Sequence, residues 1–197
     1  MTTQLSERTS LSSALKTRTA TQHERMHALM ERAQAFSSRE NYARFVAVQY
    51  LFQRDVEHLF GDAGVQAAVP DLDSRGRQAS SLADLQDLGA AVPVEEVASA
   101  GVRMPAALGW LYVSEGSTLG AAFLFKEAQS RLGLSAEFGA RHLAAYPEGR
   151  ATVWRRFVAS LDSESVAETD HEAVIAGTIA AYNRFGQLIQ QHFGFSE

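Results

Sequence analysis

The chain has 197 residues, enough for one domain of generous size, and its 18 Lys and Arg stand against 23 Asp and Glu, a formal net charge of -5. This acidic balance, without any separate basic run, disfavours nucleic acid as a partner. The absence of cysteine excludes disulfides, thiolate nucleophiles and any metal centre held by cysteine. We therefore expect one folded domain over residues 1–197, of which residues 1–9 form a flexible tail.

Targeting and membrane segments are not expected. The opening residues, MTTQLSERTS, lack the basic start and the following apolar stretch of a secretory signal. No segment approaches the ~18 apolar residues that span a membrane. These features predict a cytoplasmic protein without a membrane anchor.

Helical periodicity dominates the first third of the chain. Residues 10–33 carry an apolar stripe at helical spacing and are predicted to form one helix. A second helix is expected over 39–60, because Ser37 and Glu40 have the spacing of a capping box and Gly61 follows as a stop signal.

The rest of the chain also favours helices. Residues 62–101 are broken by Gly and Pro, with one short helix expected over 81–88, where Ser81 and Asp84 help its start. A long helix should open at Pro105 and end at Gly133. After a turn-rich connection, two more helices are expected over 151–161 and 165–193. The sequence thus predicts an all-α, single-domain, multi-helix protein.

The string HERMH at 23–27 matches a zinc-binding pattern, in which two histidines one helical turn apart bind the metal and Glu24 acts as general base. Such a site needs a third ligand. The candidates do not stand in a recognisable third-ligand motif; they are Glu40, Asp55, Glu57 and His58. A zinc hydrolase is therefore an alternative rather than the leading interpretation.

His23 itself has two further interpretations. On a regular helix it lies at the margin of the apolar stripe, where a histidine is either a core residue with satisfied hydrogen bonds or an axial ligand to a flat apolar cofactor. Lys16 lies seven residues earlier, close to the same face, and could meet a carboxylate there.

Gly116 and Gly120 are unusual because each interior glycine costs a helix roughly 0.5 to 1 kcal/mol relative to alanine. With their i, i+4 spacing they share one helix face with Tyr112, Leu119 and Phe123. This face serves either close helix–helix packing or a large flat ligand lying against the backbone. Together with His23, the second interpretation describes a heme site.

Five segments of the chain resemble the bacterial heme oxygenases that release iron from heme: TATQHERMHALM, ENYARFVAVQYLFQ, ADLQDLG, ALGWLYVSEGSTLGAAFLFK and FGARHLAAYPEGR. The resemblance implies a helical bundle that holds heme between a proximal and a distal helix. It implies His23 as the iron ligand, with His27 only a neighbour, and assigns catalysis to Gly116 and Gly120.

The resemblance also implies further heme-site residues. Lys16 and Tyr112 match the pair that steadies the propionates, which predicts biliverdin IXα as the product. Candidates for holding ordered water are Gln49, Arg77 and Trp154, and the remaining expected heme contacts are Ser117 and Phe123. His142 is assigned no role.

The implied reaction opens heme, which is both cofactor and substrate, with O2 and electrons from a reductase or ferredoxin to biliverdin, ferrous iron and CO. Two alternatives stay open at the level of sequence: a protein that binds or stores heme without degrading it, and the zinc hydrolase. The sequence does not decide between iron acquisition and bilin supply as the purpose.

Overall fold

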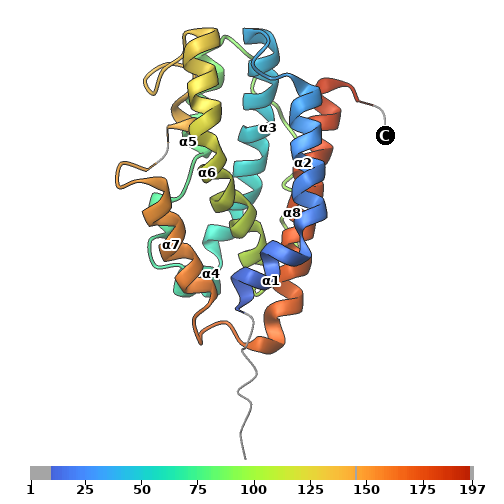
Figure 1. The fold of residues 1–197 in the computed structure, drawn as a ribbon, viewed down its shortest axis with the longest axis vertical. Coiled ribbons are helices and arrows are strands. Elements are labelled where there is room, and N and C mark those ends of the chain that lie inside the picture. The colour runs from blue at the N-terminus through green and yellow to red at the C-terminus, as the bar shows by residue number, and fades with distance from the viewer. Residues whose placement is uncertain (1–9, 145, 196–197) are drawn as a thin grey trace, which may run out of the picture.

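The fold consists of helices joined by loops and short turns, as the sequence predicts (Figure 1). The computed structural model describes residues 10–144 and 146–195. Within these ranges strand-like pairing is limited to one isolated bridge between Ser135 and Gly139. The tail expected over residues 1–9 lies outside the described residues. None of the helices in the described part combines the length and apolar character needed to cross a membrane.

The helix expected over 10–33 is divided into α1 (Leu11–Arg18) and α2 (Ala20–Ala33). The division falls at Thr19, whose backbone leaves the helical region with φ -113° and ψ 15°. Its hydroxyl and its backbone N–H both donate to the carbonyl of Leu15, at 2.8 and 3.0 Å. A threonine side chain that bonds locally competes with the helical pattern, and periodicity does not reveal this. Lys16 and His23 consequently lie on different helices.

The second predicted helix is α3 (Arg39–His58), which ends in a 3-10 turn (Leu59–Gly61). Its N-cap differs from the prediction: Ser38, rather than Ser37, accepts a hydrogen bond from the backbone of Asn41 at 3.1 Å. The next segment contains a short α4 (Ala63–Ala68), which was not predicted and is capped by Asp62.

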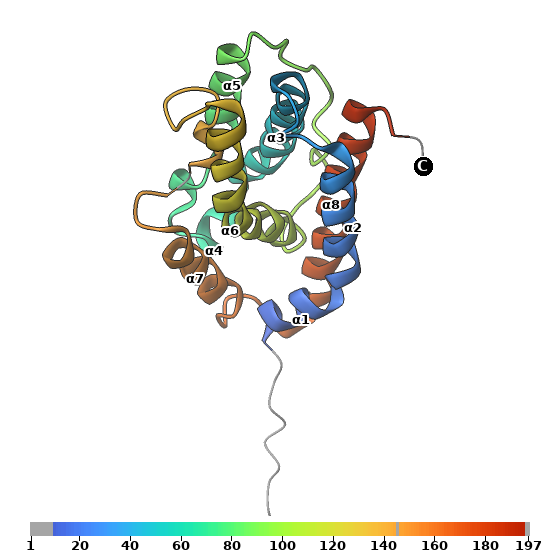
Figure 2. The same cartoon turned by 45° about the horizontal axis from the view of Figure 1, so that its top comes forward.

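Helix α5 (Gln78–Asp87) begins before the predicted residue 81, and Ser81 and Asp84 are buried within it instead of capping its start. The long α6 (Ala107–Leu132) ends at Gly133 as expected. It changes direction between its green and yellow halves (Figure 2). Then come α7 (Arg150–Leu161) and α8 (His171–Phe193), which starts later than predicted because a 3-10 turn (Glu168–Asp170) precedes it.

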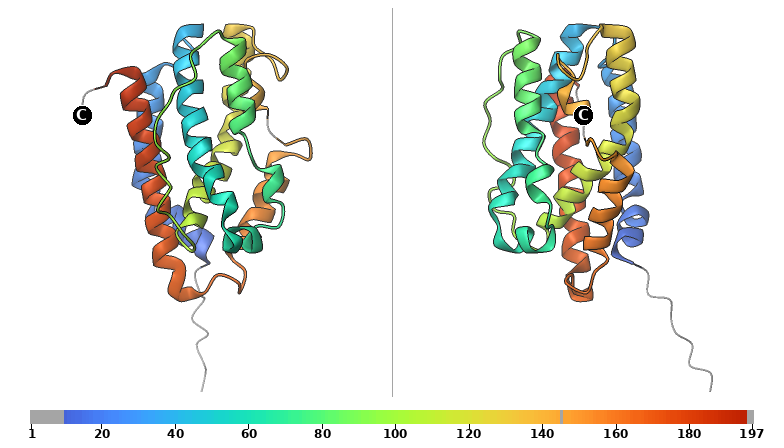
Figure 3. Two further views of the ribbon diagram at one scale, coloured as in Figure 1. Left: turned by 180° about the vertical axis from the view of Figure 1, so that it is seen from behind. Right: turned by 90° about the vertical axis from the view of Figure 1, so that its left-hand side faces the viewer.

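Helix α8 is the element that organises the site. It packs against α2, α3 and α6, and α2 and α8 run side by side in all views (Figure 3). Its contact with α6 is very close. A Cβ at Gly109 would lie 2.2 Å from the carbonyl oxygen of Val174, and one at Gly177 would lie 2.0 Å from that of Ala106. These two glycines therefore allow the helix–helix contact that fixes α6 relative to α8.

Candidate active site

The imidazole of His23 is exposed on α2 beside a second imidazole. Its Nε2 lies 3.3 Å from the Nε2 of His27, with the rings edge to face. Partial burial of the ring, and then the charge of His27, hold the pKa of His23 below its ordinary value, although Glu24 acts in the opposite direction. The ring is thus neutral at physiological pH, the form in which histidine binds a metal.

Gly116 and Gly120 leave bare backbone on α6. An added Cβ at Gly120 would meet no atom within 4 Å, and one at Gly116 would meet only the ring of Trp154, at 3.6 and 3.7 Å. Neither position packs against another helix backbone, so helix–helix packing is the wrong explanation for this pair. That role belongs to Gly109 on the same helix.

Apolar side chains flank this bare backbone and face water. Phe123 is 73% exposed and Leu119 is 39% exposed. A contiguous apolar surface next to unobstructed backbone is typical of a site that covers a flat apolar molecule. The sequence analysis assigns two further residues of α6 to the same site. Tyr112 is half-buried and Ser117 is exposed.

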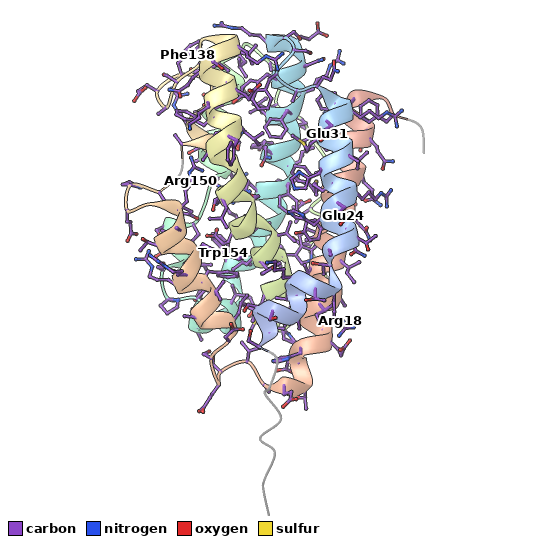
Figure 4. All side chains as sticks on the ribbon, in the orientation of Figure 1. Arg18, Glu24, Glu31, Phe138, Arg150 and Trp154 are labelled. Atoms are coloured by element: carbon purple, nitrogen blue, oxygen red, sulfur yellow. The ribbon has the colours of Figure 1, made fainter. Side chains whose placement is uncertain are left out.

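Two separate aromatic pairs lie at the site. The ring of His23 lies 6.2 Å from Tyr182 of α8, and the ring of Tyr112 lies 5.5 Å from Trp154 of α7 (centroid distances). Burial, and then Tyr112, raises the pKa of Tyr182 to about 12. Trp154 projects from α7 toward α6 (Figure 4), where its ring lies beside Gly116. The electrostatic effect of Tyr112 on Tyr182 places the two pairs near each other, and α8 packs against both α2 and α6.

A polar cavity of about 50 Å³ lies behind the α6 surface. It brings together Gln49 and Arg77, two of the residues expected to hold water, with Ser117; Trp154 is not among its lining residues. Its other lining residues are Thr118, Ala121, Leu124, His142 and Leu143. A cavity of this size and polarity has room for ordered water.

His142 is a lining residue to which the sequence analysis assigns no role. It is buried, and its Nδ1 donates to the carboxylate of Asp84 at 2.8 Å. Its Nε2 is buried without a hydrogen-bond partner among the described residues. A lone histidine in a predicted loop carries no signal of this arrangement, because Asp84 lies far away along the chain.

A buried ionic cluster supports α6 immediately before Gly116, and it was also missed. The carboxylate of Glu115 is 3% exposed and pairs with Arg75, whose side chain is 1% exposed. It also accepts hydrogen bonds from Arg77 at 3.4 Å and from the hydroxyl of Tyr146 at 2.9 and 3.0 Å. Arg77 in turn donates to the carbonyl and hydroxyl of Ser114, at 2.8 and 2.6 Å. These contacts fix the backbone where the bare surface begins.

The other predicted site residue, Lys16, is exposed on α1. Within residues 10–144 and 146–195 it has no ion-pair partner, whereas the nearby Arg18 is paired with Glu172. Its ammonium is therefore available to an incoming carboxylate.

The zinc hydrolase alternative is not supported. Among the described residues there is no group of three or more His, Asp or Glu side chains that could hold a metal ion. Asp55 is engaged with Arg54 and Arg184, and Glu57 accepts the backbone N–H groups of residues 77 and 78. The nominated third ligands do not join the two histidines.

Comparison with known proteins resolves the remaining choice. The family model described as "Heme oxygenase" matches residues 9–191. The chain belongs to the heme oxygenase family. Heme oxygenase PigA of Pseudomonas aeruginosa is 47% identical to this heme oxygenase over 173 residues, which are 87% of each protein. The family assignment confirms the resemblance seen in the sequence: the chain is a heme-degrading oxygenase, with heme as its substrate.

Solved structures agree with this assignment. The NO- and CO-bound heme oxygenase of Neisseria meningitidis has a TM-score of 0.88 and 35% identity, covering 95% of this chain and 94% of that one. Heme oxygenase 2 of Chlamydomonas reinhardtii has a TM-score of 0.77 at 17% identity, covering 92% of this chain and 96% of that one. The Leptospira interrogans enzyme has a TM-score of 0.78 at 18% identity, covering 92% and 99%. The last two share the fold with this heme oxygenase.

Proposed function

We propose that this heme oxygenase binds heme between α2 and α6, with His23 as the iron ligand and the backbone at Gly116 and Gly120 as the opposite wall. One observation carries the proposal: the backbone of α6 is bare at Gly116 and Gly120, with exposed Leu119 and Phe123 beside it. Tyr112 of the same helix acts electrostatically on Tyr182, whose ring contacts His23. Bound heme supplies redox chemistry with O2 and electrons from a reductase or ferredoxin, ending in biliverdin, ferrous iron and CO.

His23 fits the role of a neutral ligand. Its lowered pKa favours the neutral ring, which has one lone pair available to a metal, and its exposure leaves the ring accessible to a large ligand. An imidazole donates less electron density to iron than a thiolate does, and strong donation favours cleavage of the O–O bond. A histidine ligand, which favours this cleavage less, therefore suits an enzyme that inserts oxygen into the heme ring itself.

The glycines fit the role of a wall that excludes side chains. Because no Cβ stands at Gly116 or Gly120, the helix backbone can approach a flat ligand and restrict where a small molecule such as O2 is placed. There is also no acidic or basic side chain at these two positions. Proton delivery is instead assigned to the neighbouring polar cavity.

In that cavity, we assign His142 and Gln49 to holding ordered water. With Nδ1–H donating to Asp84, the Nε2 of His142 has no partner among the described residues and can form a hydrogen bond with water. Ser117 lines the same cavity and belongs to the bare surface of α6. A chain of water molecules between these groups can carry protons to the substrate without a side chain in contact with it.

Lys16 and Tyr112 are assigned to the heme propionates. The unpaired ammonium of Lys16 suits a carboxylate, and Tyr112 offers a phenol that burial keeps protonated by raising its pKa. Fixing the propionates fixes which edge of the ring faces Gly116, and we propose biliverdin IXα as the product.

The proposal is tested by titrating purified protein with heme and then adding ascorbate or a reductase system in air. We expect one heme per chain and biliverdin IXα as the main bilin in chromatography. His23→Ala should weaken heme binding at least tenfold, whereas His58→Ala, at an exposed position at the end of α3, should not. Tyr112→Phe combined with Lys16→Ala should redistribute the product among bilin isomers.

The outcomes separate the remaining possibilities. Unchanged heme binding by His23→Ala would contradict the ligand assignment, and another main isomer from the unmodified protein would contradict the propionate assignment. Heme that binds but stays intact under turnover conditions would contradict the proposal that this site carries out the reaction.

A further inference from the structure

The pair His23 and His27 has a geometry that its proposed role in heme binding does not use. The two Nε2 atoms are 3.3 Å apart, the ring centroids are 4.5 Å apart and the planes meet at 71°. Both side chains are exposed on the same face of α2, one helical turn apart. No part of the proposed heme chemistry requires His27.

The separation of the two nitrogens matches a metal chelate. Zinc binds imidazole nitrogen at about 2.0–2.1 Å with tetrahedral angles, which places two such nitrogens about 3.3–3.4 Å apart. In the N–H···N contact one Nε2 carries the proton. When that ring takes the tautomer with its proton on Nδ1, both Nε2 lone pairs become available to one metal ion at the observed separation.

We propose that, in the heme-free protein, His23 and His27 together bind one divalent transition-metal ion of the zinc or copper class. The described residues provide no third ligand, and Glu24 is turned about 100° around the helix from His23. Water completes the coordination, because both rings are exposed. Such a site is open and exchangeable, and it follows the usual order in which copper binds imidazole more tightly than zinc.

The site competes with the substrate. The imidazole Nε2 of His23 has one lone pair, so it binds either the chelated ion or the iron of heme, and occupation by the ion withholds the proposed ligand from heme. This consequence rests on the proposed role of His23; the chelate itself does not. The enzyme would therefore take up heme more slowly where free zinc or copper is abundant.

The chelate is tested on heme-free protein with the metals alone. Calorimetric titration with Zn²⁺ should show one site per chain, and electron paramagnetic resonance with Cu²⁺ should show coupling to two imidazole nitrogens. Both His23→Ala and His27→Ala should weaken the site at least tenfold. His58→Ala removes an exposed histidine that has no second histidine four residues away, and it should leave the site unchanged. Equal Zn²⁺ affinity in His27→Ala would overturn the proposal.

The competition is tested by the rate of heme uptake, followed by the Soret absorbance. One equivalent of Zn²⁺ should slow uptake at least fivefold in the unmodified protein, EDTA should restore the rate, and His27→Ala should take up heme at the same rate with or without Zn²⁺. A Zn²⁺ effect of equal size in His27→Ala would overturn the competition. If heme bound normally to His23→Ala while the Zn²⁺ site was lost, the ligand assignment would fail and the chelate would stand.

Discussion

Asp84 holds His142 through two hydrogen bonds to one carboxylate oxygen. Oδ2 accepts the backbone N–H of His142 at 2.9 Å and its Nδ1–H at 2.8 Å, while Oδ1 accepts from the backbone and side chain of Arg141 at 3.0 and 3.1 Å. The buried carboxylate thus fixes both the loop after α6 and the orientation of an imidazole that lines the polar cavity. We expect the carboxylate of Asp84 to affect the stability of the fold and the imidazole of His142 to affect turnover.

Asp84→Asn should lower the free energy of unfolding by roughly 2–4 kcal/mol at pH 7, because an amide cannot accept all four hydrogen bonds of a buried carboxylate. Burial raises the pKa of Asp84, but the hydrogen bonds and charge of His142 outweigh it and hold this pKa below its usual value. The ionised group therefore stabilises the fold above about pH 4, near its unfolded pKa.

Below about pH 4 the contribution of Asp84 is lost as the pH falls through the lower folded pKa. Urea denaturation at a series of pH values should show the difference between Asp84→Asn and the unmodified protein shrinking in acid. The exposed Asp73→Asn serves as control and should change stability little. A pH-independent difference would contradict this account.

His142→Leu should slow biliverdin formation about tenfold and leave heme affinity unchanged, because the residue is assigned to water in the cavity rather than to heme. The measurement is single-turnover absorbance beside a heme titration, with His58→Leu as control. An unchanged turnover rate would remove His142 from the proton path.

Gly120→Ala and Gly109→Ala should have opposite effects on stability. A methyl group at Gly120 meets nothing, so the change should stabilise α6 by about 0.5–1 kcal/mol. It should nevertheless reduce heme turnover by occupying the bare surface. At Gly109 the added carbon would strike the backbone of α8, which should cost roughly 2–4 kcal/mol or prevent folding. Thermal unfolding and the turnover assay distinguish the two, and a loss of stability in Gly120→Ala would contradict the open surface.

Glu115→Gln should destabilise the protein by about 3 kcal/mol, because it leaves the buried guanidinium of Arg75 without a charged partner at this end. Glu127→Gln is a matched control on the same helix. Its partner Arg131 is exposed, so its loss should cost less than about 1 kcal/mol. Chemical denaturation gives the free energy of unfolding of both variants. Equal losses would show that the buried ion pairs of Glu115 stabilise the protein no more than an exposed pair does.

Local patterns were sufficient for most of the fold. Apolar periodicity with Pro105 and Gly133 at the ends predicted a helix very close to α6, because these residues act on the backbone within one turn. The break at Thr19 escaped the prediction because its hydroxyl contact with Leu15 leaves the apolar pattern intact. The interior glycines Gly116 and Gly120, and His23 at the edge of the apolar stripe, were recognisable as unusual from the residues around them.

The sequence by itself therefore determined the helical class, the resemblance to heme oxygenases, and the candidates His23, Gly116 and Gly120, since each is readable from neighbouring residues. Only the tertiary structure decided that Gly120 is open while Gly109 is packed, and that Asp84 and Glu115 hold His142 and Arg75. Those pairs are separated by 58 and 40 positions. No local rule connects residues so far apart; their meeting depends on how α5, α6 and the loops pack together.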